Sequence, residues 1–322
     1  MKRHNNLYQQ IISKENLQLA DINARKGKSK QACIKKHDEK KEENISNLHY
    51  QLKNKIYKTS DYTTFTISDP KERLIYRLPY IDRVVHHAIM IPLEPIFVST
   101  FTSDTYNCIK GRGVYAASNY LKKSLRDVEG TTYCLKIDIK KFYPSVNNDI
   151  LKGLIRRKFK DKDLLWLLDG IIDSADGLPI GNLLSQTFSN FYLTYFDHWI
   201  KESQKVLYYM RYSDDMVFLS SSKQFLHKLL ANIKEYLSSN LKLTLKSNYQ
   251  VFLVKARGID VLGYVFFHTH TLIRKRVKQK FARILKRLHL PNRASINSYL
   301  GLFKHGNCMN LINTLMYNGA TS

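Results

Sequence analysis

The sequence predicts an α+β fold in which helices cover one side of a sheet. Short runs rich in β-branched and aromatic residues alternate with longer segments whose apolar residues recur at three- and four-residue spacing. No glycine-rich βαβ fingerprint accompanies the strand-like runs, and the chain has neither an internal repeat nor a low-complexity linker. Together these observations favour an α+β architecture.

The charge of the chain indicates a nucleic-acid partner. The 322 residues include 52 Lys and Arg against 27 Asp and Glu, which gives a net charge of +25. This excess of positive charge is typical of proteins that neutralise many phosphates. The basic residues are spread along the chain and mixed with aromatic residues, so they do not form one amphipathic membrane-binding helix. At 43% hydrophobic residues, the chain can build one large core or two to three subdomains.

Cysteine usage and the N-terminus predict a cytoplasmic protein. The four cysteines lie far apart and form no Cys-x-x-Cys pair, so neither a zinc knuckle nor a disulfide framework is expected. The N-terminus lacks the apolar segment of a signal peptide, and no run of about 18 apolar residues could span a membrane.

The N-terminal part of the chain predicts helices and one hairpin. Residues 1–58 have apolar residues at helical spacing, and a basic stretch at 25–30 interrupts them, which predicts helix, loop and helix. Residues 63–70 alternate like a strand, so residues 73–78 are expected to pair with them. Residues 81–97 predict a helix packed on one face.

The rest of the chain predicts strands separated by helices. Residues 132–139 form a central strand, and a helix at 144–159 follows, with Pro144 suited to its first turn. The other expected elements are a helix at 182–200, a hairpin around 212–216, a helix at 223–238, strands at 241–245 and 259–267, and a basic helical segment at 274–290.

Two adjacent carboxylates lie at the tip of the expected hairpin, in the sequence YSDDM (212–216). Acidic residues are ordinary in turns, so a solvated turn is the alternative interpretation. Asp138, however, ends an otherwise apolar strand, where a carboxylate is costly unless it is paired or binds a cation. Asp138, Asp214 and Asp215 could converge on two Mg²⁺ ions about 3.5–4 Å apart, which is the arrangement that assists phosphoryl transfer.

Several motifs resemble those of the reverse transcriptases. KIDIKKFYPSV (136–146) resembles their motif A, GLPIGNLLSQTFSNFYL (177–193) motif B, and RYSDDMVFL (211–219) motif C. RLIYRLPYIDRVVHHAI (73–89) is similar to the fingers motifs, and VLGY (261–264) to the primer-grip motif. The motifs occur in the order and at the spacing of the family.

The resemblance covers residues 60–270 and a tail, YLGLFKHGNCMNL (299–311), that is similar to the thumb end of intron-type enzymes. It implies a right-hand polymerase with fingers, a palm with an antiparallel sheet, and a small helical thumb. The implied divisions are an N-terminal helical basic extension (1–60), fingers with the first palm elements (61–131), the palm with the catalytic motifs and primer grip (132–268), and the thumb (269–322).

The resemblance also implies roles for individual residues. Asp138, Asp214 and Asp215 would ligate two Mg²⁺ ions, with Mn²⁺ able to substitute, and the backbone carbonyl of Ile139 would be a further ligand. Lys246 would donate a proton to pyrophosphate. The implied nucleotide-binding residues are Lys71, Arg73, Tyr143, Ile180, Gly181 and Gln186, and the implied primer grip is Leu262, Gly263 and Tyr264. The alternatives are a core aromatic at Tyr143 and surface charges at Lys71 and Arg73.

Motif B carries the information on the subtype. Many reverse transcriptases have Gln after the Leu-Pro of this motif, whereas Ile180 stands there in this chain. The pattern resembles the enzymes of diversity-generating retroelements, which copy a template RNA with frequent errors at adenines. Loss of a hydrogen bond that only the correct geometry satisfies lowers discrimination. The alternative is an Ile that only packs the helix.

The expected partners follow from the same resemblance. They are a template RNA, the cDNA/RNA duplex, dNTPs and a small basic pentameric helical accessory protein, with no membrane. Two alternatives stay open: an intron-type or abortive-infection reverse transcriptase, and a catalytically silent RNA-binding module. Retention of all three carboxylates together with Tyr143 argues against the silent module.

Overall fold

The computed structural model describes residues 3–68, 71–287 and 293–307. The chain divides into two compact units, and each is built from segments that are distant in sequence. The first unit comprises Met1–Ser103, Ile139–Trp199 and Glu235–Thr244, and the second comprises Asp104–Asp138, Ile200–Lys234 and Leu245–Ser322. The linear boundaries expected for fingers, palm and thumb stay predictions.

Four helices open the first unit, two on each side of the basic stretch that was predicted to interrupt them. Asp21 in the second helix is fully buried and accepts hydrogen bonds from Arg25 and from the Tyr80 hydroxyl. Its pairing with these two groups allows a charge inside the core. The helices are α1 (Tyr8–Ile12), α2 (Lys14–Ala24), α3 (Ala32–Asp38) and α4 (Lys41–Lys53), and α5 (Tyr80–Val98) packs against α2.

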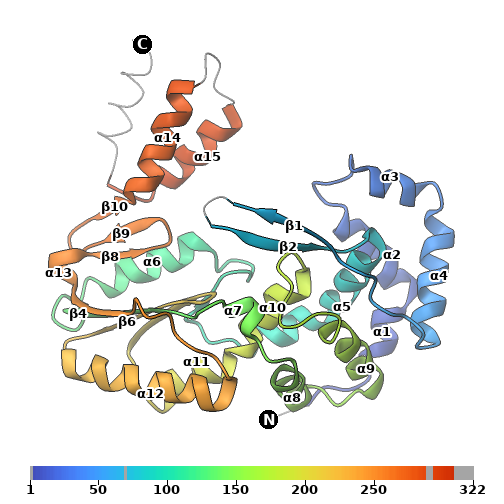
Figure 1. Ribbon diagram of the computed structural model, residues 1–322, viewed down its shortest axis with the longest axis horizontal. Coiled ribbons are helices and arrows are strands. Elements are labelled where there is room, and N and C mark those ends of the chain that lie inside the picture. Colours follow the sequence, from blue (N-terminus) through green and yellow to red (C-terminus); the bar gives the residue numbers. More distant parts are fainter. Residues whose placement is uncertain (1–2, 69–70, 288–292, 308–322) are drawn as a thin grey trace. The chain divides into compact units, whose positions relative to one another are not determined.

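The predicted hairpin is present as β1 (Thr63–Ile67) and β2 (Arg73–Arg77), paired antiparallel (Figure 1). Most of its side chains are exposed. The backbone N–H of Tyr76 donates to the carbonyl of Ile180 at 2.8 Å, so the hairpin is bonded to the motif B loop. Of the predicted strand 63–70, residues 69 and 70 lie outside the described residues.

Two long helices predicted from the sequence are each divided in the structure. Residues 144–159 form α7 (Phe142–Ser145) and α8 (Asn148–Lys158), because the Asn147 side chain accepts a hydrogen bond from Ile150 N–H and begins a new helix. Pro144 therefore lies inside α7 and not in the first turn of a long helix. Residues 182–200 form α10 (Leu183–Tyr192) and α11 (Thr194–Glu202), separated at Leu193.

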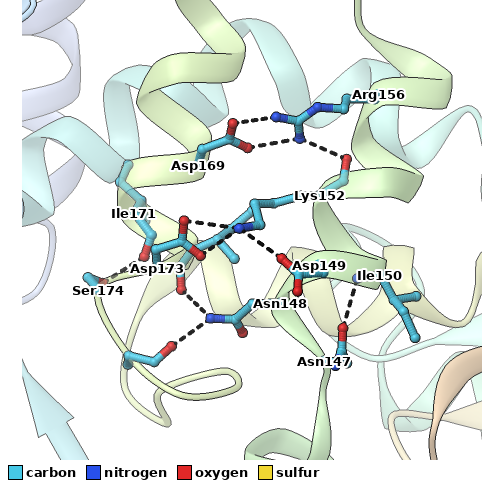
Figure 2. Close-up of polar contacts among 12 residues, drawn as sticks. Asn147, Asn148, Asp149, Ile150, Lys152, Arg156, Asp169, Ile171, Asp173 and Ser174 are labelled. Atoms are coloured by element: carbon cyan, nitrogen blue, oxygen red, sulfur yellow. Dashed lines mark hydrogen bonds and ion pairs between the residues drawn. The ribbon is translucent and has the colours of Figure 1, made fainter.

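Helix α8 packs against α9 (Lys162–Ile172) through both apolar and charged side chains. Arg156 contacts the Asp169 carboxylate with two nitrogens, and Lys152 pairs with Asp173 at 2.9 Å (Figure 2). These pairs are partly exposed and contribute less than about 1 kcal/mol each. Burial of apolar side chains stabilises the pair of helices more, and these residues are Leu151, Leu154, Ile155, Leu164, Leu167 and Leu168.

The second unit is built on a five-stranded sheet with the order β3-β5-β6-β4-β7. All pairings are antiparallel except that of β3 with β5. The strands are β3 (Thr105–Tyr106), β4 (Tyr133–Asp138), β5 (Tyr208–Tyr212), β6 (Asp215–Ser220) and β7 (Gln250–Leu253), and α6 (Val114–Ser124) and α12 (Lys223–Leu241) accompany them (Figure 1).

The sheet is covered on both faces, whereas the sequence predicted helices on one side. Four consecutive residues of β6, Met216–Leu219, are buried, and neighbouring residues of a strand point to opposite faces. On one face Val217 and Leu219 belong to a core cluster with Leu121 of α6. On the other face Phe218 and its cross-strand neighbour Tyr209 stack on each other and are both fully buried. The sequence pattern could not predict this burial on both faces, because a strand buried on both sides does not alternate between polar and apolar residues.

Two predicted strands differ in the structure. The predicted strand 241–245 is wrong, because α12 continues to Leu241 and the edge strand is β7. The predicted strand 259–267 is divided by a turn at Leu262 and Gly263, which both have positive φ. The resulting strands are β8 (Ile259–Val261) and β9 (Tyr264–Phe266), and β10 (Thr271–Ile273) completes a three-stranded sheet after the short helix α13 (Val254–Arg257).

Helices α14 (Lys275–Arg287) and α15 (Arg293–Phe303) follow, as the basic helical end of the sequence predicted. Phe281 and Phe303 are buried and their ring centroids lie 4.9 Å apart, so the two helices share an apolar contact. Residues 288–290 of the predicted thumb helix, Cys308 and the last residues of the chain lie outside the described residues. Within the described part of the chain, none of the helices combines the length and apolar character needed to cross a membrane.

Candidate active site

Three carboxylates meet at one end of the five-stranded sheet. Asp138 ends β4, and Asp215 begins β6 directly opposite it in the antiparallel register. Asp214 lies in the tight turn between β5 and β6, which Ser213 forms with a positive φ of 57°. The adjacency of β4 and β6 therefore brings together the three acidic residues that the sequence singled out.

The environment of Asp214 and Asp215 disfavours their negative charge. Burial and the nearby charge of Asp138 raise the pKa of Asp214 to about 6. Burial also raises the pKa of Asp215, and the charge of Lys136 partly offsets that effect. Such a cluster is stabilised when a cation neutralises it.

Asp138 has one paired and one unpaired oxygen. The Lys246 ammonium forms an ion pair with Oδ2, and Lys246 N–H donates to the Asp138 carbonyl at 2.9 Å. Oδ1 is buried and has no hydrogen-bond partner. An unpaired buried carboxylate oxygen beside two carboxylates of raised pKa suits a divalent cation, because hard cations prefer carboxylate oxygens. Among the described residues, no three His, Cys, Asp or Glu side chains are already arranged to hold a metal.

A cavity of about 220 Å³ adjoins the carboxylates within the second unit. Lys136 and Arg257 bring positive charge to it, and Lys136 Nζ donates to the Asp260 carbonyl at 2.6 Å. Lys136 was not among the predicted site residues, although its position two residues before Asp138 places both side chains on one face of β4. The lining residues are Lys136, Ile137, Asp138, Asp215, Asn248, Gln250, Phe252, Arg257, Gly258 and Asp260.

The predicted nucleotide-binding residues belong to the first unit. Lys71 and Arg73 are exposed at the hairpin, and Gln186 is exposed on α10. Tyr143 is half-buried, with its hydroxyl 3.4 Å from Ser189 Oγ and its carbonyl accepting from Leu178 N–H at 2.9 Å. The roles of these side chains in nucleotide binding stay predictions.

Gly181 is needed where the motif B loop meets the hairpin. Its φ is +123°, and a Cβ placed there would lie 2.5 Å from the carbonyl oxygen of Tyr76. The close approach that Gly181 permits in the structure is therefore to strand β2. Ile180, whose carbonyl accepts from Tyr76 N–H, is half-buried.

A second cavity of about 430 Å³ lies within the first unit, where the basic stretch after α2 meets the hairpin and the motif B loop. Lys28, Arg77 and Arg83 line it, and no acidic side chain does. Sequence reasoning missed this cavity because its residues come from three distant segments. The others are Gln31, Ala32, Phe65, Ile75, Tyr76, Leu78, Gly181 and Asn182.

The predicted primer-grip residues have two different environments. Leu262 and Gly263 form a half-buried turn, which leaves them available for contact. Tyr264 is fully buried, and its hydroxyl donates to the Leu302 carbonyl at 2.8 Å. Tyr264 therefore anchors β9 to α15, and the assignment of Leu262, Gly263 and Tyr264 to a primer grip stays a prediction.

Comparisons with known proteins agree with the motifs. Protein YkfC of Escherichia coli (strain K12) is 24% identical over 249 residues, which cover 63% of this chain and 64% of YkfC. The group II intron-encoded protein LtrA of Lactococcus lactis is 24% identical over 173 residues, or 49% of this chain and 28% of LtrA. The chain thus spans less than two thirds of the length of these relatives.

Solved structures of telomerase from Candida Tropicalis share the fold. The apo form has a TM-score of 0.51 at 12% identity and covers 69% of this chain and 49% of the telomerase chain. The complex with a TWJ fragment of telomeric RNA also has a TM-score of 0.51, at 13% identity, with coverages of 81% and 55%. This likeness supports the α+β right-hand polymerase fold.

A family model agrees with the same part of the chain that carries the motifs. Residues 57–266, about two thirds of the sequence, match the model described as reverse transcriptase (RNA-dependent DNA polymerase). This stretch includes the hairpin, the motif B loop and all three carboxylates. The chain therefore belongs to the reverse transcriptase family.

Proposed function

We propose that the protein is an RNA-directed DNA polymerase whose reaction depends on Asp138, Asp214 and Asp215. The observation that carries this proposal is the cluster of three carboxylates, with raised pKa values at Asp214 and Asp215 and an unpaired oxygen on Asp138. Their oxygens and the Ile139 carbonyl would hold two Mg²⁺ ions, or Mn²⁺ in their place. When bound, these ions would supply positive charge that stabilises the oxygen of the attacking 3′-hydroxyl and the negative charge on the departing pyrophosphate.

Residues of the first unit would bind the incoming dNTP. The exposed cations Lys71 and Arg73 suit the triphosphate, because a guanidinium matches phosphate oxygens with two donors. The Tyr143 ring would exclude a ribose 2′-hydroxyl. Ile180, Gly181 and Gln186 would contact the nascent pair. In the second unit, Lys246 would protonate the leaving pyrophosphate.

The second cavity provides a surface for the template RNA. Its three cations can neutralise backbone phosphates, and the exposed ring of Phe65 together with Tyr76 can stack on bases. The telomerase that shares this fold was solved with an RNA fragment, which supports RNA as the template class. The cDNA/RNA duplex would be the product.

Primer extension on an RNA template with dNTPs and Mg²⁺ tests the proposed activity. We expect extension by the wild type and loss of extension in Asp138→Asn, because the amide cannot ligate a cation as a carboxylate does. Asp149→Asn is the matched control, since Asp149 is an exposed carboxylate in α8. Absence of extension by the wild type would favour a silent RNA-binding module.

We also propose the finer assignment to the diversity-generating retroelement type, with frequent errors at template adenines. The residue that supports it is Ile180, whose side chain has no donor to check the nascent pair. This assignment includes a template repeat RNA and a small basic pentameric accessory protein as partners. Sequencing of cDNA made by the wild type and by Ile180→Gln tests it. We expect fewer errors opposite adenine in the variant, and identical error spectra would contradict the assignment.

A second candidate is an intron-type reverse transcriptase. The likeness to the intron-encoded protein LtrA favours it. This candidate predicts accurate copying of template adenines by the wild type, so the same sequencing experiment separates the two.

A further inference from the structure

The ammonium group of Lys246 forms an ion pair with Asp138, one of the carboxylates proposed to bind metal. Its ammonium pairs with Asp138 Oδ2, and its backbone N–H is bonded to the carbonyl of the same residue at 2.9 Å. Two contacts to one residue fix both the backbone and the charge of Lys246 at the end of β4. The ammonium therefore neutralises the same carboxylate that a divalent cation at Oδ1 would ligate.

Neighbouring cations are engaged with a different residue. Lys136 Nζ donates to the Asp260 carbonyl at 2.6 Å, and Arg274 pairs with Asp260 Oδ1 at 2.5 Å. Their charges act on the carboxylates over a longer distance, whereas Lys246 makes direct contact with Asp138. Lys246 is therefore the side chain whose position a bound cation would change most directly.

We propose that Lys246 is a built-in counter-ion that competes with the divalent cation for Asp138, so that metal binding displaces its ammonium from Oδ2. This inference rests on the proposed metal-dependent polymerase activity. The ammonium satisfies only one oxygen and leaves Oδ1 unpaired. A divalent cation carries twice the charge and can be ligated by several carboxylates at once, so it is the stronger partner of the cluster.

The competition has a consequence for both partners. Two cations that share one carboxylate group repel each other, and binding of either one weakens binding of the other by the same factor. Without metal, Lys246 reduces the repulsion among the three carboxylates. With metal, its ammonium is released from Asp138, so metal binding frees the group proposed to protonate pyrophosphate.

The first test uses the wild-type chain and therefore does not depend on whether a variant folds. Lysines are labelled with an amine-reactive ester with and without Mg²⁺, and the labelling rate of each is measured by mass spectrometry. Mg²⁺ should raise the rate at Lys246 by a factor of about two to five, because the ion pair that protects the amine is lost. Lys223, exposed at the start of α12, should not change. An unchanged or lower rate at Lys246 would overturn the inference.

The second test measures Mn²⁺ affinity from the paramagnetic resonance signal of free Mn²⁺. Lys246→Met retains the aliphatic chain but removes the competing charge, so it should bind Mn²⁺ about fivefold more tightly than the wild type. Lys223→Met removes the same charge elsewhere in the unit and should bind as the wild type does.

The outcomes separate the inference from the function on which it rests. Equal or weaker Mn²⁺ binding by Lys246→Met would overturn the competition while leaving the polymerase proposal intact. Failure of the wild type to bind Mn²⁺ at all would overturn the proposed metal-dependent function, and the inference with it.

Discussion

At the residue scale, the molecule depends on a few positions whose surroundings allow little change. Gly181 is one, because its backbone conformation and its distance to Tyr76 both exclude a side chain. We predict that Gly181→Ala lowers the free energy of unfolding by about 1–3 kcal/mol and weakens polymerase activity. The alanine would be strained at this positive φ, and its Cβ would clash with the hairpin. Urea unfolding measures the change in stability.

Gly153 offers the matched control for this substitution. It lies in the middle of α8, and a Cβ there would meet no atom within 4 Å. Gly153→Ala should raise the free energy of unfolding by about 0.5–1 kcal/mol, as alanine favours a helix. Equal effects of the two substitutions would contradict the role assigned to Gly181.

His86 makes the stability depend on pH. It is buried in α5 with an unpaired Nε2, and burial lowers its pKa to about 3. The unfolded chain binds a proton near pH 6.5 and the folded chain does not, so stability falls as the pH drops below that value. Between pH 6.5 and pH 5 the loss should be about 1.6 kcal/mol.

Unfolding curves of the wild type and His86→Leu at several pH values check this prediction. The variant should lose less stability on acidification, and the difference between the two proteins isolates the contribution of His86 from other titrating groups. If the wild type and the variant lost stability equally on acidification, His86 would accept a proton in the folded state, which would contradict the prediction.

At the scale of elements, hydrophobic patterns identified most strands and helices, while the interruptions depended on single contacts. Strands β4 and β6, which carry Asp138 and Asp215 at their ends, were predictable because apolar residues precede or follow these acidic residues. The division at Asn147 was missed because its capping bond competes with a continuous helical pattern. The alternation of LKLTL (241–245) suggested a strand, but Leu241 is the last residue of α12 and Leu243 lies in the loop after it, and both are buried.

The candidate site was predictable only in part, for a related physical reason. The carboxylates occur in short motifs at the ends of strands that pair, so their proximity could be predicted from the sequence. The second cavity combines a loop, a hairpin and the motif B turn, and no local pattern relates these segments. The Lys246 ion pair depends on the path of the chain after α12. The strand expected at 241–245 predicted a different path.

The bond between Tyr264 and Leu302 links β9 to α15. Tyr264→Phe removes the hydroxyl and leaves a carbonyl without this donor, so the free energy of unfolding should fall by about 0.5–1.5 kcal/mol. Tyr50→Phe is the control, because Tyr50 is 59% exposed. Thermal unfolding of both variants tests the prediction, and an unchanged melting temperature for Tyr264→Phe would refute the anchoring role.

At the scale of the whole molecule, the charge of +25 should make RNA binding strongly dependent on salt. If six or more phosphates are contacted, the affinity should fall by about 10³-fold between 50 and 200 mM salt, because binding releases counter-ions. A series of binding titrations at increasing salt gives the slope. A change of less than tenfold would mean that electrostatic contacts with phosphates contribute little.

The central claim is that Asp138, Asp214 and Asp215 act together in nucleotide addition. The most direct measurement is the single-turnover rate of adding one dNTP to a primer on an RNA template, for the wild type and each Asp→Asn variant. We predict that every variant loses at least about 10³-fold in rate, because the ions that these carboxylates would hold would stabilise the charge on both reacting oxygens. A variant at any of the three positions that retains the wild-type rate would contradict the account.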